Sequence, residues 1–243
     1  MKRALTIIAL LAGTMVLHGQ TVDTAAQIVD HYLEILGSDR LPADSTLVME
    51  TVITSPGSTD TFLMKRWYTQ PQMFRIEVWR GKSIQTGMCS NGKDRFRNYN
   101  QSLGYWVDLS PYNFHLRFMS YDFRGPLYNW RSQGAELTYM GPATVIGQKG
   151  MQAVKVVMPD MYDRVYFFEP SGLMSMLVES GELDSLHTDR EGVHIDWKFI
   201  HEYQQIGSSL LPKQESFLRN GVLTVLETKA YLEKRNTLIF NQD

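Results

Sequence analysis

After residue 42, short runs of alternating apolar and polar residues constrain the fold more than any other feature of the sequence. Phe74, Ile76 and Val78 alternate with charged or polar neighbours, and the segment 195–199 repeats the pattern. Successive side chains of a β-strand point to opposite faces of its sheet, so each run predicts a half-buried strand. The run 74–78 therefore places Phe74, Ile76 and Val78 on one face.

Turn signals separate these runs at hairpin spacing. They include Pro56-Gly57, Asn91-Gly92 and Asn220-Gly221. Together they predict about ten or eleven strands, with separate strands at 136–140 and 141–146 and a final hairpin at 213–219 and 222–232. No β-α-β unit recurs, so the expected product is one antiparallel sheet.

Two segments before and within the strand pattern are expected to be helical. Residues 24–36 carry apolar side chains at spacings of three and four, Thr24 or Asp23 can cap the first turn, and Gly37 can end the helix. Residues 121–130 predict a loop with a helical turn. The fold class is thus α+β and mainly antiparallel β. No linker divides residues 20–243, which indicates a single domain.

The first nineteen residues have the character of an export signal. Lys2 and Arg3 precede an apolar run at 4–17, which is short for a membrane span. We expect cleavage after Gly19, give or take a residue or two, and a protein in the periplasm that is not an integral membrane protein. Cys89 is the only cysteine, so the fold is expected to stand without an internal disulfide. With 24 basic and 26 acidic residues, the composition argues against nucleic acid as a partner.

Catalytic and metal-binding patterns do not reach a recognisable form. The segment 141–150 lacks the spacing of a phosphate-binding loop and lies between strands. His194, Asp196 and His201 could suggest a metal site, but solvated strand residues are the more economical interpretation. Asp160 and Asp163 do not fit a calcium loop. We expect no enzyme activity, no cofactor and no metal.

The order of the motifs along the chain resembles the LolA/LolB-like superfamily, especially its outer-membrane lipoprotein-sorting branch. The resemblance rests on the helix ending at Gly37, the run 70–77, the Asn91-Gly92-Lys93 turn, the run 166–173, and Leu210-Leu211-Pro212. It implies a half-open β-barrel covered by the N-terminal helix and a short helical lid, with a cavity for acyl chains. Phe74 matches the phenylalanine of the family's Pro-x-x-Phe segment, whereas Gln70 stands where the carrier has a basic residue.

These observations predict a lipid cavity lined by alternate residues of successive strands. The expected ligand-binding residues are Phe74, Ile76, Val78, Trp106, Phe167, Trp197 and Phe199. Arg75, Glu77, Asp196 and Lys198 are expected to face water. The predicted function is a periplasmic carrier or holder of lipoprotein acyl chains or another lipid. The alternatives are an envelope-assembly scaffold with a closed core, which could have a protein partner, and a hydrolase of unknown type.

Overall fold

The computed structural model describes residues 21–37, 42–69, 73–92, 95–109, 123–125, 127–145, 147–159, 163–180, 195–219, 221–235 and 238–240. The expected export signal and cleavage site lie outside these residues, as do His194 and Asp160. Within them, no helix is long and apolar enough to cross a bilayer.

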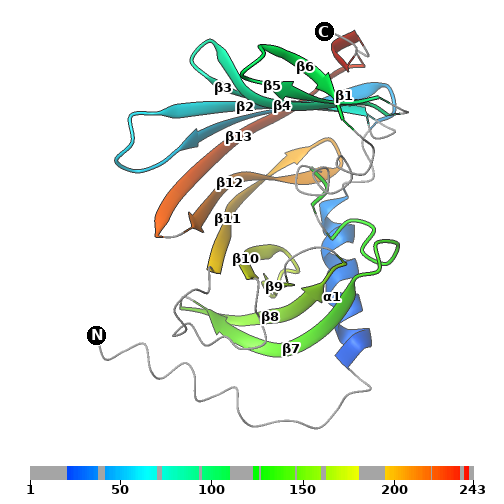
Figure 1. Ribbon diagram of the computed structural model, residues 1–243. Helices are drawn as coiled ribbons and strands as arrows, with labels where there is room; N and C mark the ends of the chain where they lie inside the picture. Colours follow the sequence, from blue (N-terminus) through cyan, green and yellow to red (C-terminus); the bar gives the residue numbers. More distant parts are fainter. Residues whose placement is uncertain are drawn as a thin grey trace.

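A single curved antiparallel sheet dominates the structure (Figure 1). Its strand order is β6-β5-β4-β3-β2-β1-β13-β12-β11-β10-β9-β8-β7, so almost every strand pairs with its neighbours in sequence, and β1 pairs with β13. The strands are β1 (Ser45–Thr54), β2 (Thr61–Thr69), β3 (Met73–Arg80), β4 (Ser83–Asn91), β5 (Phe96–Asn100), β6 (Tyr105–Asp108), β7 (Glu136–Val145), β8 (Gln148–Val157), β9 (Asp163–Phe168), β10 (Met174–Ser180), β11 (Ile195–Ile206), β12 (Ser209–Arg219) and β13 (Val222–Lys234).

The α+β, mainly antiparallel class is confirmed, and two details of the prediction need correction. The sheet has thirteen strands, more than the expected ten or eleven. The expected break at Gly141 is absent. This residue has a φ of 97° beside a register shift, so β7 bends there and continues. The sheet stays open, with β6 and β7 at its edges.

The expected N-terminal helix is confirmed as α1 (Thr21–Leu36). Gly37 follows it with a φ of 55°, and its amide donates to the Leu33 carbonyl at 3.1 Å, which closes the last turn. Ala25 and Val29 are fully buried against β7–β12. On the exposed side, Arg131 makes a two-pronged ion pair with Asp30. The second helical element expected at 121–130 is not found in its described residues, where 123–125 and 127–130 form turns.

The register divides the side chains of the sheet between two faces. Val154 and Tyr166 pack in the apolar cluster that contains α1. We call their face the inner face and the opposite one the outer face. The inner face can be followed from strand to strand across the sheet, because directly paired residues of adjacent strands point to the same face. The inner-face partners run from Tyr139 through Val154, Tyr166, Leu177, Lys198, Phe217 and Thr224, and again from Leu226 through Ile53 and Phe62.

The outer face of β3–β6 carries a covered layer of charged and aromatic side chains. Arg75 and Glu77 form an ion pair at 2.6 Å, with side chains only 11% and 6% exposed. The Trp106 ring lies under the Arg75 guanidinium, and the Arg75 Nη1 donates to the Ile239 carbonyl of the 3-10 turn η2 (Leu238–Phe240). The expectation that Arg75 and Glu77 face water was wrong, because the C-terminal turn covers this pair.

Candidate ligand site on the inner face

The residues expected to line one cavity are divided between the two faces. Phe74, Ile76 and Val78 lie on the inner face through their partners Tyr68, Arg66 and Met64. The remaining four lie on the outer face, Trp106 beside Gly87 and Arg75, and Phe167, Trp197 and Phe199 in a separate cluster. The prediction that all of them share a face was therefore wrong.

The division has a simple cause in the two-residue period. The pattern assigns parity within one strand, but each turn decides how the parity of one strand relates to that of the next. Between β3 and β6 lie two further strands and a register shift after Val78. Tyr105, rather than Trp106, has the inner-face parity, and it is 54% exposed at the sheet edge.

Phe74 and Ile76 are core residues of the inner face. They are 1% and 3% exposed and belong to a cluster of eight buried residues: Leu47, Met49, Tyr68, Phe74, Ile76, Met88, Leu211 and Ala230. The Phe74 ring lies 6.3 Å from the Tyr68 ring, and Phe123 packs on Tyr68 from outside the sheet. Phe74 therefore supports the sheet, and a ligand would reach it only by displacing its neighbours.

A stripe of polar side chains crosses the inner face beside this core. The Thr51 and Thr228 hydroxyls lie 2.8 Å apart, and Arg66 Nη2 donates to Thr51 Oγ1 at 2.8 Å. On the neighbouring strands Lys198 Nζ lies 2.5 Å from the buried Glu215 carboxylate. We call these five residues, Arg66, Thr51, Thr228, Glu215 and Lys198, the polar stripe. Sequence reasoning missed it, because threonine and charged residues in strands normally predict a solvated face.

Beyond the polar stripe, a row of apolar side chains crosses five adjacent strands, and most of them are partly exposed. We call them the apolar strip: Ile53, Phe62, Met64, Val78, Phe217 and Leu226. Leu226 is the most buried member at 9% exposed, and the other five are of intermediate exposure. Val78 is thus the one sequence-predicted site residue that lies on the inner face without being core.

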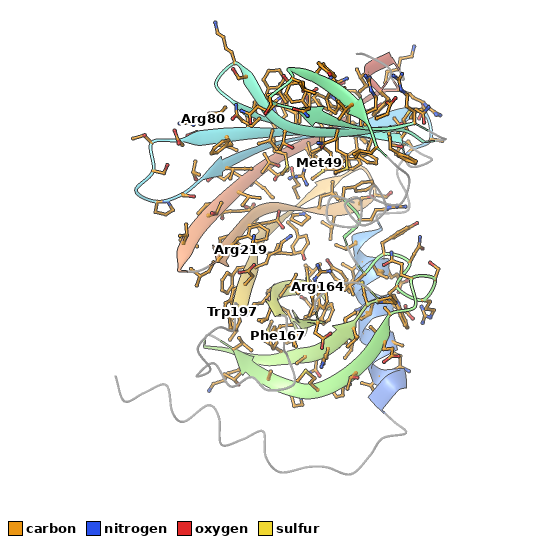
Figure 2. All side chains as sticks on the ribbon, viewed as in Figure 1. Met49, Arg80, Arg164, Phe167, Trp197 and Arg219 are labelled. Carbon is orange, nitrogen blue, oxygen red and sulfur yellow. The ribbon has the colours of Figure 1, made fainter. Side chains whose placement is uncertain are left out.

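The two halves of the curved sheet turn their inner faces toward each other (Figure 2). Met49 projects from β1 toward the β7–β10 half, and Arg164 of β9 lies on the facing side of that half. Figure 2 also shows Trp197 of β11 and Phe167 of β9 farther from Met49 than Arg164 is.

The outer-face cluster of β7–β11 is the other apolar concentration. Its buried members are Met151, Ala153, Val165, Phe167, Met176 and Val178. Trp197 and Phe199 stack at its edge with their ring centroids 6.0 Å apart, and Phe199 stacks in turn on His201. Because Phe167 is only 6% exposed, this cluster also has the character of core.

Reactive groups in the described residues are few. Burial raises the pKa of the Cys89 thiol, which disfavours the nucleophilic thiolate. His201 shares a hydrogen bond with Ser216 at 2.8 Å. The part of the chain that the structure describes has no group of three or more His, Cys, Asp or Glu side chains placed to hold a metal.

An open, curved antiparallel sheet with a helix on its inner face is the LolA-like fold. A LolA superfamily protein from Nitrosomonas europaea matches 90% of this chain and 98% of its own, with a TM-score of 0.58 and 12% identity. A DUF1329 family protein from Desulfovibrio piger matches 84% of this chain and 91% of its own, with a TM-score of 0.52 and 13% identity. An outer membrane lipoprotein-sorting protein domain from Vibrio parahaemolyticus matches 86% of this chain and 94% of its own, with a TM-score of 0.51 and 14% identity.

The sequence by itself matches no protein-family model and no curated protein. At these low identities the structural likeness establishes the fold, and it confirms the resemblance found in the order of the motifs.

Proposed function

We propose that this protein is a non-enzymatic periplasmic holder or carrier of lipid acyl chains, which it binds along the apolar strip of the inner face. The observation that supports the proposal most strongly is the strip itself. Five of its six apolar side chains are only partly buried although they lie on the face that turns inward. A folded core would normally cover such residues, so their partial exposure on a curved inner face favours a removable apolar ligand.

The energetics suit a carrier. Each methylene group transferred from water to an apolar surface contributes about 0.8 kcal/mol, so covering part of an alkyl chain is enough for useful affinity. Met64 adds an adaptable thioether side chain, which can follow a flexible ligand. Ordering the alkyl chain opposes binding and keeps the complex reversible.

The test is displacement of the uncharged dye N-phenylnaphthylamine from the purified protein by hexadecanol. Ile53→Gln places an amide in the strip and should weaken binding of hexadecanol about tenfold, equivalent to about 1.4 kcal/mol. Val52→Gln is the matched control, since Val52 is the adjacent residue, faces outward and is 41% exposed. Equal effects of the two substitutions, or an absence of dye binding, would contradict the proposal.

A scaffold with a closed core is the second candidate, and the burial of Phe74 and Ile76 supports it. Mass spectrometry of organic extracts from the purified protein separates the two. A co-purifying lipid supports the carrier. A protein that carries no lipid and binds no dye supports the scaffold.

A further inference from the structure

Arg66 has a hydrogen-bonding capacity that the described part of the chain does not fill. Its Nη2 donates to Thr51 Oγ1, but its Nε atom is buried and has no hydrogen-bond partner. None of the ion pairs in the described ranges includes Arg66. A buried donor without an acceptor is costly, and it marks a place where the acceptor group of a ligand can bind.

Lys198 and Arg219, two other cations of the inner face, differ from Arg66 because each pairs with a carboxylate. Lys198 pairs with Glu215 at 2.5 Å, and on the same strands Arg219 pairs with Asp196 at 2.9 Å. The polar stripe therefore holds two cations and one carboxylate. Its net charge of one positive unit comes from Arg66, which lies on the inner face between the core residues Met49 and Ile76 of the adjacent strands.

The apolar strip begins directly beside this charge. Met64 is two residues from Arg66 on the same face of β2, a separation of about 7 Å along the strand. The strip then crosses five adjacent strands from β3 to β12. At about 4.8 Å between strands, it extends over about 19 Å, which is comparable with a long alkyl chain. The inner face thus places the Arg66 guanidinium beside one elongated apolar surface.

We propose that the inner face binds a long-chain fatty acid, with its carboxylate on Arg66 and its alkyl chain along the apolar strip. This inference rests on the proposed function and names the class of ligand. The planar guanidinium fork suits a carboxylate, which can accept a hydrogen bond from it with each oxygen. One carboxylate balances the net charge of the polar stripe, whereas a dianionic phosphate monoester would leave a negative charge uncompensated in an apolar surrounding.

The experiment compares palmitate with hexadecanol in the same dye-displacement assay at pH 8, where the fatty acid carboxylate is ionised. Wild-type protein should bind palmitate at least tenfold more tightly than hexadecanol. Arg66→Gln should weaken palmitate binding tenfold or more and leave hexadecanol binding unchanged. Arg66→Lys should keep part of the affinity for palmitate that Arg66→Gln loses, because lysine keeps the positive charge but lacks the two-pronged guanidinium group.

Lys65→Gln is the matched control. Lys65 is the adjacent residue on β2, lies on the outer face and pairs with Glu50 at 3.3 Å. It should leave both ligands unaffected. The comparison of the two ligands on wild-type protein requires no variant, so the proposal remains testable if Arg66→Gln does not fold.

The outcomes separate this inference from the proposed function. Equal wild-type affinity for palmitate and hexadecanol, or an Arg66→Gln protein that still prefers palmitate, would overturn the fatty acid assignment and leave the acyl-chain holder standing. A lysophosphatidic acid, which carries a phosphate monoester, would overturn the carboxylate as the head group if it bound more tightly than palmitate. Failure of wild-type protein to bind any of these ligands would overturn both proposals.

Discussion

Replacing Phe74 by alanine tests whether this residue is core or cavity wall. The Phe74 side chain is 1% exposed and packs against Tyr68 in the largest apolar cluster of the β1–β4 half. Deleting a fully buried phenylalanine ring removes its transfer free energy and leaves a cavity, at a combined cost of about 3–5 kcal/mol. The free energy of unfolding, measured by urea denaturation, should fall by that amount.

Met64→Ala is the comparison on the neighbouring strand. Met64 is partly exposed in the apolar strip, so its truncation should cost about 1 kcal/mol, near the average for single substitutions. It should weaken displacement of the dye by hexadecanol. Phe74→Leu keeps most of the buried volume, so it should fold and bind hexadecanol like the wild type.

The opposite pattern would refute this reasoning. If Phe74→Ala lowered the unfolding free energy by less than about 1 kcal/mol and Phe74→Leu lost alkyl binding, Phe74 would line an open cavity. The sequence-based assignment of Phe74 to the ligand site would then be correct, and the apolar strip would not be the main contact surface.

Two further predictions concern ion pairs. Glu77→Gln removes the carboxylate that pairs with the buried Arg75 guanidinium and should lower the free energy of unfolding by about 3 kcal/mol in urea denaturation. Glu50→Gln breaks the more exposed pair with Lys65 and should cost less than about 1 kcal/mol. Similar costs for both substitutions would show that η2 does not shield the first pair. The hydrogen bonds from Arg131, and after them the one from Trp130, hold the pKa of Asp30 below its usual value. The ionised carboxylate therefore stabilises the fold fully above the ordinary aspartate pKa of about 3.9. This stabilisation is lost as the pH falls through the lower pKa of the folded state. The difference in unfolding free energy between wild type and Asp30→Asn should therefore be larger at pH 6 than at pH 2.5, and a constant difference would contradict the assignment.

Most of the fold could be predicted from local patterns. The helix at 24–36 and the hairpin at 213–219 and 222–232 follow from apolar spacing and from turn residues, and both are present as α1 and as β12 with β13. The boundaries were less accurate. Leu210, Leu211 and Pro212 lie inside β12 instead of preceding it, because pairing with β11 extends the strand to Ser209. Tertiary pairing decided that extension.

The candidate site could be predicted only in part. Phe74, Ile76 and Val78 share a face because they belong to one strand, as their spacing required. Trp106 and Trp197 were assigned to the same face without any local signal that links separate strands. The place of Arg66 in the proposed ligand site could not be predicted at all, because an arginine in a polar-looking run predicts exposure until its neighbours in space are known.

The sequence alone determined what depends on neighbours along the chain: the antiparallel class, the N-terminal helix and its buried side, and the resemblance in motif order that the LolA-like fold confirms. The tertiary structure decided what depends on register, because one residue of shift at any turn reverses the faces of every strand that follows. It placed Trp106 outside and Ile76 inside, and it covered Arg75 and Glu77 with η2. It also brought Arg66 beside Thr51, fifteen residues away in the chain, and left its Nε without an acceptor in the described residues.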